Sequence, residues 1–176
     1  MEKISIQYPI GKYEPKPFSE KQKKEWLSDL SWLPAELENA VLNLDEGQIQ
    51  MPYRDGGWTI NQLIHHVADS HINAYTRFKL GLTESNPTIR PYDQDQWALL
   101  NDVKTLPFNT SLTLLFALHK RWVATLENLS AEDWLRTVQH PESEEPWTLW
   151  FMLGMYVWHG HHHTQHILKW RERNNW

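Results

Sequence analysis

Apolar side chains recur at intervals of three and four residues in four long stretches of the chain, a spacing typical of helices that bury one face. These stretches cover approximately residues 19–44, 59–82, 110–128 and 148–173. Ser19 and Thr59 are each followed three residues later by a glutamine, so both are expected to form capping boxes. Pro34 is expected to interrupt or kink the first helix, because proline has no N–H group. Four long helices joined by loops indicate an all-α bundle.

The segments between these stretches predict an arm, short helices and turns. Residues 8–18 combine prolines with aromatic residues and favour an extended arm packed on the body. A short helix is expected around Trp97, and residues 140–147 are expected to form a loop or a small hairpin. Ser130 and Asp133 are expected to cap a short helical turn. The expected core of the third helix consists of Leu112, Leu115, Phe116, Leu118, Trp122 and Leu126.

Length and composition exclude several classes of protein. A chain of 176 residues suits one domain, residues 1–176, and can bury a core without cross-links. The net charge of −5 gives no basic surface for nucleic acid. The absence of cysteine excludes disulfides, thiolate ligands and a cysteine nucleophile. No apolar run approaches the ~18 residues of a membrane span, and the first residues do not look like a secretory signal, so a cytoplasmic location is expected.

Histidines crowd the last predicted helix, which holds five of the ten in the chain. Residues at helical spacing share a face, so four of the five lie along one stripe, namely His159, His162, His163 and His166. His161 points the other way and is expected to face solvent. A polar outer face or hydrogen-bonded core histidines would also explain part of this cluster. A stripe of imidazoles nevertheless favours a metal site.

A pair such as His159 and His163, one helical turn apart, can offer two nitrogen ligands to one ion. A third histidine from a neighbouring helix would leave a fourth position for water, which is the arrangement of catalytic sites. On the second helix, periodicity places His71 toward the core, His66 at its border and His65 outside. Spacing does not choose between His66 and His71 as the third ligand. A lone His119 on the third helix is expected to be structural.

Other chemically active residues are scattered along the chain. Possible general bases or partners of a ligand are Asp55, Asp69, Glu84 and Asp93, although solvated or capping roles are commoner for such residues. Asp69 follows His66 by nearly one turn and could orient its imidazole. Arg54 and Arg90 are expected in loops at the mouth of the bundle, where either could bind an anionic group. The chain contains no nucleophile elbow, phosphate-binding loop or Rossmann glycine pattern.

Five segments in order carry a resemblance to a known family. They are YPIGKYEP (8–15), PYRDGGWTINQLIHHVADSH (52–71), RFKLGLTE (77–84), IRPYD (89–93) and YVWHGHHHTQHI (156–167). With these segments the chain resembles the YfiT family within the DinB-like four-helix-bundle superfamily. The family's metal ligands are a histidine eight residues after the tryptophan that opens the second helix, and an HxxxH pair on the last. The resemblance therefore implies His66, His159 and His163 as ligands.

The same resemblance implies an activity, a metal ion, an oligomeric state and a cellular location. Members are named metal-dependent hydrolases and are described as binding zinc or nickel. The resemblance therefore implies one divalent ion per chain, zinc before nickel, together with a water activated by it and a small-molecule substrate. It also implies a homodimer in the cytoplasm. Relatives in the superfamily transfer thiols such as bacillithiol to electrophiles, so a metal-dependent thiol S-transferase is the alternative enzyme. A non-catalytic bundle that binds metal or a ligand is the alternative outside enzymes.

Overall fold

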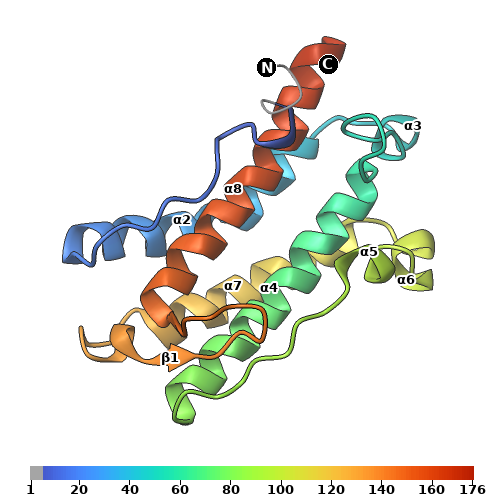
Figure 1. Ribbon diagram of the computed structural model, residues 1–176. Coiled ribbons are helices and arrows are strands. Elements are labelled where there is room, and N and C mark those ends of the chain that lie inside the picture. Colours follow the sequence, from blue (N-terminus) through green and yellow to red (C-terminus); the bar gives the residue numbers. More distant parts are fainter. Residues whose placement is uncertain (1–5) are drawn as a thin grey trace.

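A computed structural model describes residues 6–176, in which four long helices form a bundle (Figure 1). They are α2 (Glu20–Val41), α4 (Ile60–Thr83), α7 (Asn109–Leu126) and α8 (Leu149–Asn174). The short connecting helices are α3 (Glu46–Ile49), α5 (Gln94–Trp97), α6 (Asn101–Thr105) and the 3-10 helix η1 (Asp133–Leu135). The all-α bundle is thus confirmed. Two short helices, α5 and α6, stand where one was expected.

Each long helix packs against two others. α2 contacts α7 and α8, and α4 contacts the same two helices. In Figure 1, α4 and α8 lie side by side toward the viewer, with α2 and α7 behind them. Strand β1 (Thr137–Val138) pairs antiparallel with β2 (Trp147–Thr148) beside the start of α8, which confirms the small hairpin. No helix within residues 6–176 has the length and apolarity needed to cross a membrane.

The helix starts follow the predicted capping residues, with one difference. The Thr59 side chain accepts from the Gln62 N–H group and the Gln62 side chain accepts from the Thr59 N–H group, so this capping box is complete. Ser19 accepts from the Gln22 N–H group, but Gln22 Oε1 accepts from Lys16 Nζ instead of the Ser19 amide. The first helix therefore has its N-cap without the reciprocal bond. It also continues through Pro34 to Val41.

The third helix corrects the expected core. Leu112, Leu115, Trp122 and Leu126 are buried as predicted, whereas Phe116 is 42% exposed and Leu118 half-buried. The buried stripe of α7 passes through His119, which is 1% exposed. A prediction from apolar residues alone does not count this histidine, and it therefore places Phe116 on the buried face of the helix.

The arm before α2 lies along α8, as expected (Figure 1). Trp158 Nε1 donates to the Gly11 carbonyl at 3.2 Å, and Trp150 Nε1 donates to the Lys16 carbonyl at 2.7 Å. His166 Nε2 donates to the Gln7 carbonyl at 3.1 Å. The arm is thus held to the same helix that carries the histidine stripe. The expectation of no secretory signal rests partly on residues 1–5, which lie outside the described residues.

A close approach between α2 and α8 depends on Gly160. A Cβ atom at this position would lie 1.7 Å from Leu33 Cδ1, so the buried Leu33 side chain or one of the two helices would have to shift. Glycine leaves room for the Leu33 side chain directly against the α8 backbone. The contact lies directly beside His159 and therefore influences where that imidazole is presented.

Candidate metal centre

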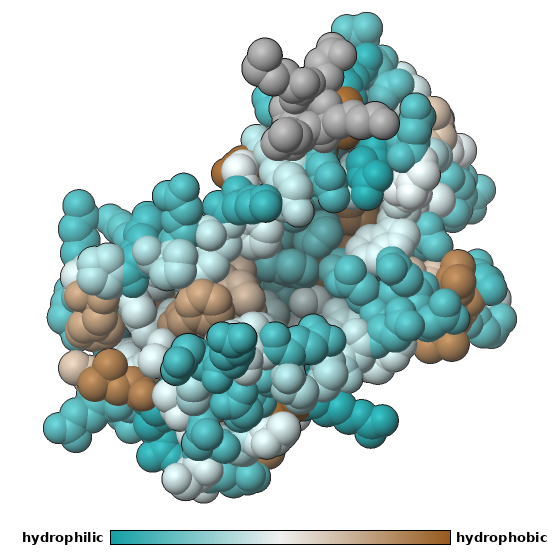
Figure 2. Space-filling view, in the orientation of Figure 1, coloured by the Kyte–Doolittle hydropathy of each residue, from teal (hydrophilic) through white to brown (hydrophobic). Residues whose placement is uncertain are grey.

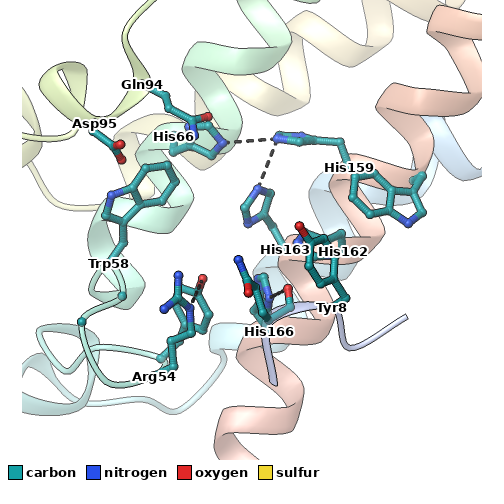
Figure 3. A pocket seen from close by; sticks show the side chains of 15 residues that line it. Tyr8, Arg54, Trp58, His66, Gln94, Asp95, His159, His162, His163 and His166 are labelled. Carbon is teal, nitrogen blue, oxygen red and sulfur yellow. Dashed lines mark hydrogen bonds between the residues drawn. The ribbon is translucent and has the colours of Figure 1, made fainter. Parts of the chain in front are cut away.

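The structure brings His66 of α4 together with His159 and His163 of α8 (Figure 3). His159 Nε2 lies 3.2 Å from His66 Nε2 and 3.2 Å from His163 Nε2. The three candidate ligand atoms all lie within 4.8 Å of one another. The i,i+4 spacing on α8 aligns two of the rings, and the contact of α4 with α8 supplies the third. The three imidazoles therefore converge on one point.

This donor set fits a divalent metal ion. Two nitrogens bound to one tetrahedral zinc ion at about 2.0–2.1 Å lie about 3.3–3.4 Å apart. The two Nε2–Nε2 separations of 3.2 Å are close to that value. Imidazole nitrogens suit zinc, nickel, copper and ferrous iron. Three protein ligands also leave a position for water or a substrate.

Burial keeps these imidazoles in the neutral form that binds metal. It lowers the pKa of His66 to about 4. It also lowers the pKa of His159 and His163 well below the ordinary value, and the neighbouring imidazoles add to the effect. Neutral imidazole has a free lone pair, whereas imidazolium has none.

A cavity of about 490 Å³ opens over the three histidines. Figure 2 shows this face of the molecule hollowed near its centre. The lining comes from the arm, the loop before α4, the start of α5 and α8, and comprises Gln7, Tyr8, Tyr53, Arg54, Gly56, Gly57, Trp58, His66, Gln94, Asp95, Trp158, His159, His162, His163 and His166. Trp58 lies against His66 with ring centroids 4.5 Å apart. Arg54, whose Nε donates to Tyr53 Oη at 2.9 Å, supplies a positive charge.

Three nitrogens in this region lack hydrogen-bond partners among the described residues. They are the buried Nδ1 atoms of His162, His163 and His166. His162 is stacked on Trp158 with ring centroids 4.6 Å apart, and His166 is stacked on Tyr53 at 4.3 Å. His162 and His166 therefore form part of the cavity wall. Neither residue belongs to the group of three histidines whose candidate ligand atoms converge.

The remaining histidines have other positions. His71 is fully buried, and its Nε2 lies 3.3 Å from His159 Nδ1, the ring nitrogen that faces away from the proposed ion. His65 was expected outside, but it is 5% exposed and bonded to Ser111 Oγ and the Leu106 carbonyl. The α6–α7 segment covers that side of α4, which periodicity within α4 could not reveal. His161 is half-buried, with Nδ1 3.3 Å from a Glu36 oxygen.

Of the charged residues that the sequence offered as general bases, partners of a ligand or anion-binding groups, one lines the cavity and the others do not. Arg54 lines it, whereas Arg90 offers its carbonyl to Arg77. Asp69 does not line the cavity, and no hydrogen bond joins its carboxylate to an imidazole within residues 6–176. Burial, followed by the charge of Asp102, raises the pKa of Asp69 to about 6.

The other acidic candidates lie outside the lining. Asp93 caps α5, and both Asp55 and Glu84 are exposed. Asp95, which was not singled out from the sequence, does line the cavity, as does Gln94. The cap at Asp93 begins the helix that carries these two residues. In the sequence, the capping residue Asp93 was therefore the signal that a short helix follows, and this helix supplies Gln94 and Asp95 to the cavity wall.

Known proteins are similar to this chain over most of its length. The DinB superfamily matches residues 29–167. YfiT of Bacillus subtilis (strain 168), provisionally named a metal-dependent hydrolase, is 47% identical over 177 residues, covering 100% of this chain and 99% of that protein. A relative from Bacillus cereus (strain B4264) with the same provisional name is 49% identical over 172 residues, covering 97% and 98%.

The solved structure of YfiT from Bacillus subtilis superposes with a TM-score of 0.96 at 47% identity, covering 98% of this chain and 99% of that one. It is described as "a probable metal-dependent hydrolase with an unusual four-helix bundle topology". The similarity thus extends over the whole bundle and includes the segments that carry the three histidines.

Proposed function

The chain belongs to the YfiT family of the DinB superfamily, and on that premise we propose that it is a metal-dependent hydrolase. One observation carries the proposal: three neutral imidazoles from two helices converge beneath an open cavity. A buried site with no approach from solvent would favour a structural ion. The cavity favours a site at which a small molecule reacts.

His66, His159 and His163 are the proposed ligands of one divalent ion per chain. When bound, such an ion lowers the pKa of a coordinated water to about 7 and polarises a carbonyl group. The cluster has three protein ligands and no acidic one. We propose zinc as the resident metal and nickel as the alternative, since both suit a site of imidazole nitrogens.

The cavity lining supports a small substrate with an anionic part. Trp58 and Trp158 offer flat apolar surfaces for its body. Arg54 offers a guanidinium group that can pair with a carboxylate or a phosphate. The arm residues Gln7 and Tyr8 complete one part of the cavity wall.

The first experiment concerns the metal itself. Protein purified without an affinity tag is expected to contain about one divalent ion per chain by elemental analysis. Chelation should remove the ion and abolish turnover of an ester or amide panel, and zinc or nickel should restore both. Native protein that contains no divalent metal and takes up none would refute the proposal.

A thiol S-transferase is the second candidate, because Arg54 at the cavity equally suits the carboxylates of a low-molecular-weight thiol. The metal-loaded protein would then leave the ester and amide panel unchanged and conjugate a thiol to monochlorobimane. Metal binding without either reaction would support a non-catalytic binding protein.

The assembly and location are also proposals. The resemblance supports one domain over residues 1–176, a homodimer and a cytoplasmic location. Sedimentation equilibrium of the metal-loaded protein should give twice the chain mass of 21.0 kDa. A mass of one chain across the micromolar range would contradict the dimer.

A further inference from the structure

A line of hydrogen bonds runs from the metal centre through the interior of the bundle. His159 Nδ1 lies 3.3 Å from His71 Nε2, and His71 Nδ1 lies 2.8 Å from His119 Nε2. His119 Nδ1 lies 2.6 Å from the Leu30 carbonyl oxygen. The four residues belong to α8, α4, α7 and α2, so the line crosses all four long helices.

Pro34 explains why the Leu30 carbonyl can end this line. Within a helix, the carbonyl of residue 30 would accept from the N–H group of residue 34. Residue 34 is a proline inside α2 and has no N–H group to donate. The Leu30 oxygen is therefore free of its helical partner and accepts from His119 instead.

The carbonyl at the end fixes the direction of every bond. An oxygen of this kind only accepts, so His119 Nδ1 carries the hydrogen and His119 Nε2 is left with a lone pair. His71 Nδ1 must then donate to His119, which leaves His71 Nε2 to accept from His159 Nδ1. The lone pair of His159 is thereby assigned to Nε2, the nitrogen that faces His66 and His163.

This order requires each ring to hold one hydrogen. His71 is 0% exposed and His119 1% exposed. Burial lowers the pKa of His119 to about 4, and the interior position of His71 likewise disfavours a charged ring there. Neutral rings with one donor and one acceptor each can form the line in only one direction.

We propose that Leu30, His119 and His71 form a positioning relay that fixes the tautomer and orientation of His159, so that its Nε2 lone pair points at the metal centre. The role of the relay in metal binding rests on the proposed function. Ligand histidines generally depend on such a partner for their other nitrogen. His163 Nδ1 has no comparable partner among the described residues, so of the two proposed ligands on α8 it is His159 that is held in place before an ion arrives.

The direct test is the tautomer of each ring. Two-bond nitrogen–hydrogen correlation spectra of metal-free, nitrogen-15-labelled protein should show His71, His119 and His159 all protonated at Nδ1. Assignment uses the variants His71→Gln and His119→Gln. A hydrogen on His159 Nε2 or His119 Nε2 in the wild-type spectrum would overturn the proposal. This measurement needs neither a metal nor a substrate, so it decides the relay even if the hydrolase proposal fails.

Zinc affinity tests the relay's purpose. His119→Phe removes both bonds of that residue, and competition with a chelator should show zinc binding weakened about 10–100-fold. His119→Gln keeps one donor and one acceptor and should bind within about threefold of the wild type. His65→Phe on α4 is the matched control, since His65 is also buried but its hydrogen bonds point away from the cavity, and the variant should bind zinc as the wild type does.

The possible results separate the two proposals. Wild-type zinc affinity in a folded His119→Phe protein would refute the relay while leaving the metal centre intact. A wild type that binds no divalent metal would refute the hydrolase proposal instead. If His119→Phe does not fold, the wild-type tautomer spectrum still decides.

Discussion

Two groups of histidines lie within the same bundle and differ in their hydrogen bonds. The interior histidines are His65, His71 and His119, and the cavity histidines are His66, His159, His162, His163 and His166. Both ring nitrogens of every interior histidine have a partner. Three of the cavity histidines have a buried nitrogen without one among the described residues. All but one of the eight are less than a tenth exposed, and His159 is intermediate.

The comparison shows that burial alone does not identify a functional histidine. A buried polar group left unsatisfied costs about 1–3 kcal/mol, and most folded proteins avoid it. Among the described residues, the Nδ1 atoms of His162, His163 and His166 lack a partner, whereas every ring nitrogen of the interior histidines has one. The two groups therefore differ in hydrogen bonding and not in burial.

The largest expected effect separates two neighbours within the cavity group. His162 and His163 are adjacent and each 8% exposed, but only His163 belongs to the convergent set. His163→Ala should weaken zinc binding more than about 100-fold, because one of the three proposed ligands is lost. His162→Ala should change it less than about threefold. Equal losses in a chelator competition would show that the cavity group acts as a whole.

The second effect concerns an interior histidine and stability. His65→Leu leaves the Leu106 carbonyl and the Ser111 hydroxyl without their partner, and should lower the free energy of unfolding by about 1–3 kcal/mol. Urea denaturation measures this change. Zinc affinity should remain that of the wild type, and a parallel loss of zinc affinity would erase the distinction between the groups.

The third effect is a pH dependence of the interior group. The pKa of His119 is about 4 in the folded protein and about 6.5 when unfolded, so the unfolded chain binds more protons between these values. Stability is therefore complete above pH 6.5 and falls as the pH decreases. From pH 7 to pH 5 this residue should account for roughly 2 kcal/mol.

Urea denaturation of metal-free wild type and His119→Gln at both pH values isolates this contribution. The wild type should lose roughly 2 kcal/mol more than the variant on acidification. Identical losses would mean that the pKa of His119 is the same in the folded and the unfolded protein.

The smallest effect comes from Pro34. Pro34→Ala restores an N–H group that competes for the Leu30 carbonyl, and sharing the acceptor should weaken the bond from His119 by about 0.6 kcal/mol. Zinc binding should weaken about threefold, while thermal unfolding should show no loss of stability, since alanine favours helix. An unchanged zinc affinity would mean that the carbonyl accepts both hydrogens without cost.

The sequence could predict the helices and the existence of a histidine site, because helical spacing appears directly in the order of residues. It could not choose between His66 and His71 on α4. The structure supplies the reason: both approach His159, one at Nε2 and the other at Nδ1. The family resemblance proposes His66, and the cavity lies on that side.

Features that depend on packing between helices escaped prediction. His65 is covered by α6 and α7, and Asp95 reaches the cavity from a short helix distant in sequence. The sequence shows no partner near His119, because its hydrogen-bond partners lie on two other helices, α2 and α4. Pro34 could be recognised in the sequence as a break in helical hydrogen bonding. The role of the Leu30 carbonyl that it leaves free could not be recognised, because its donor, His119, belongs to another helix.

Gly160 has a consequence for protein engineering. Replacing glycine by alanine within helices is a common route to thermostability, with a gain of up to about 1 kcal/mol. At this position the added methyl group would meet the side chain of Leu33, which is fully buried, so the Leu33 side chain or α8 itself would have to shift. A shift of α8 would move His159, the next residue, relative to its partner His71 on α4. Work to stabilise the protein should therefore keep this glycine as it would keep a proposed ligand, although the glycine contributes no atom to the proposed metal centre.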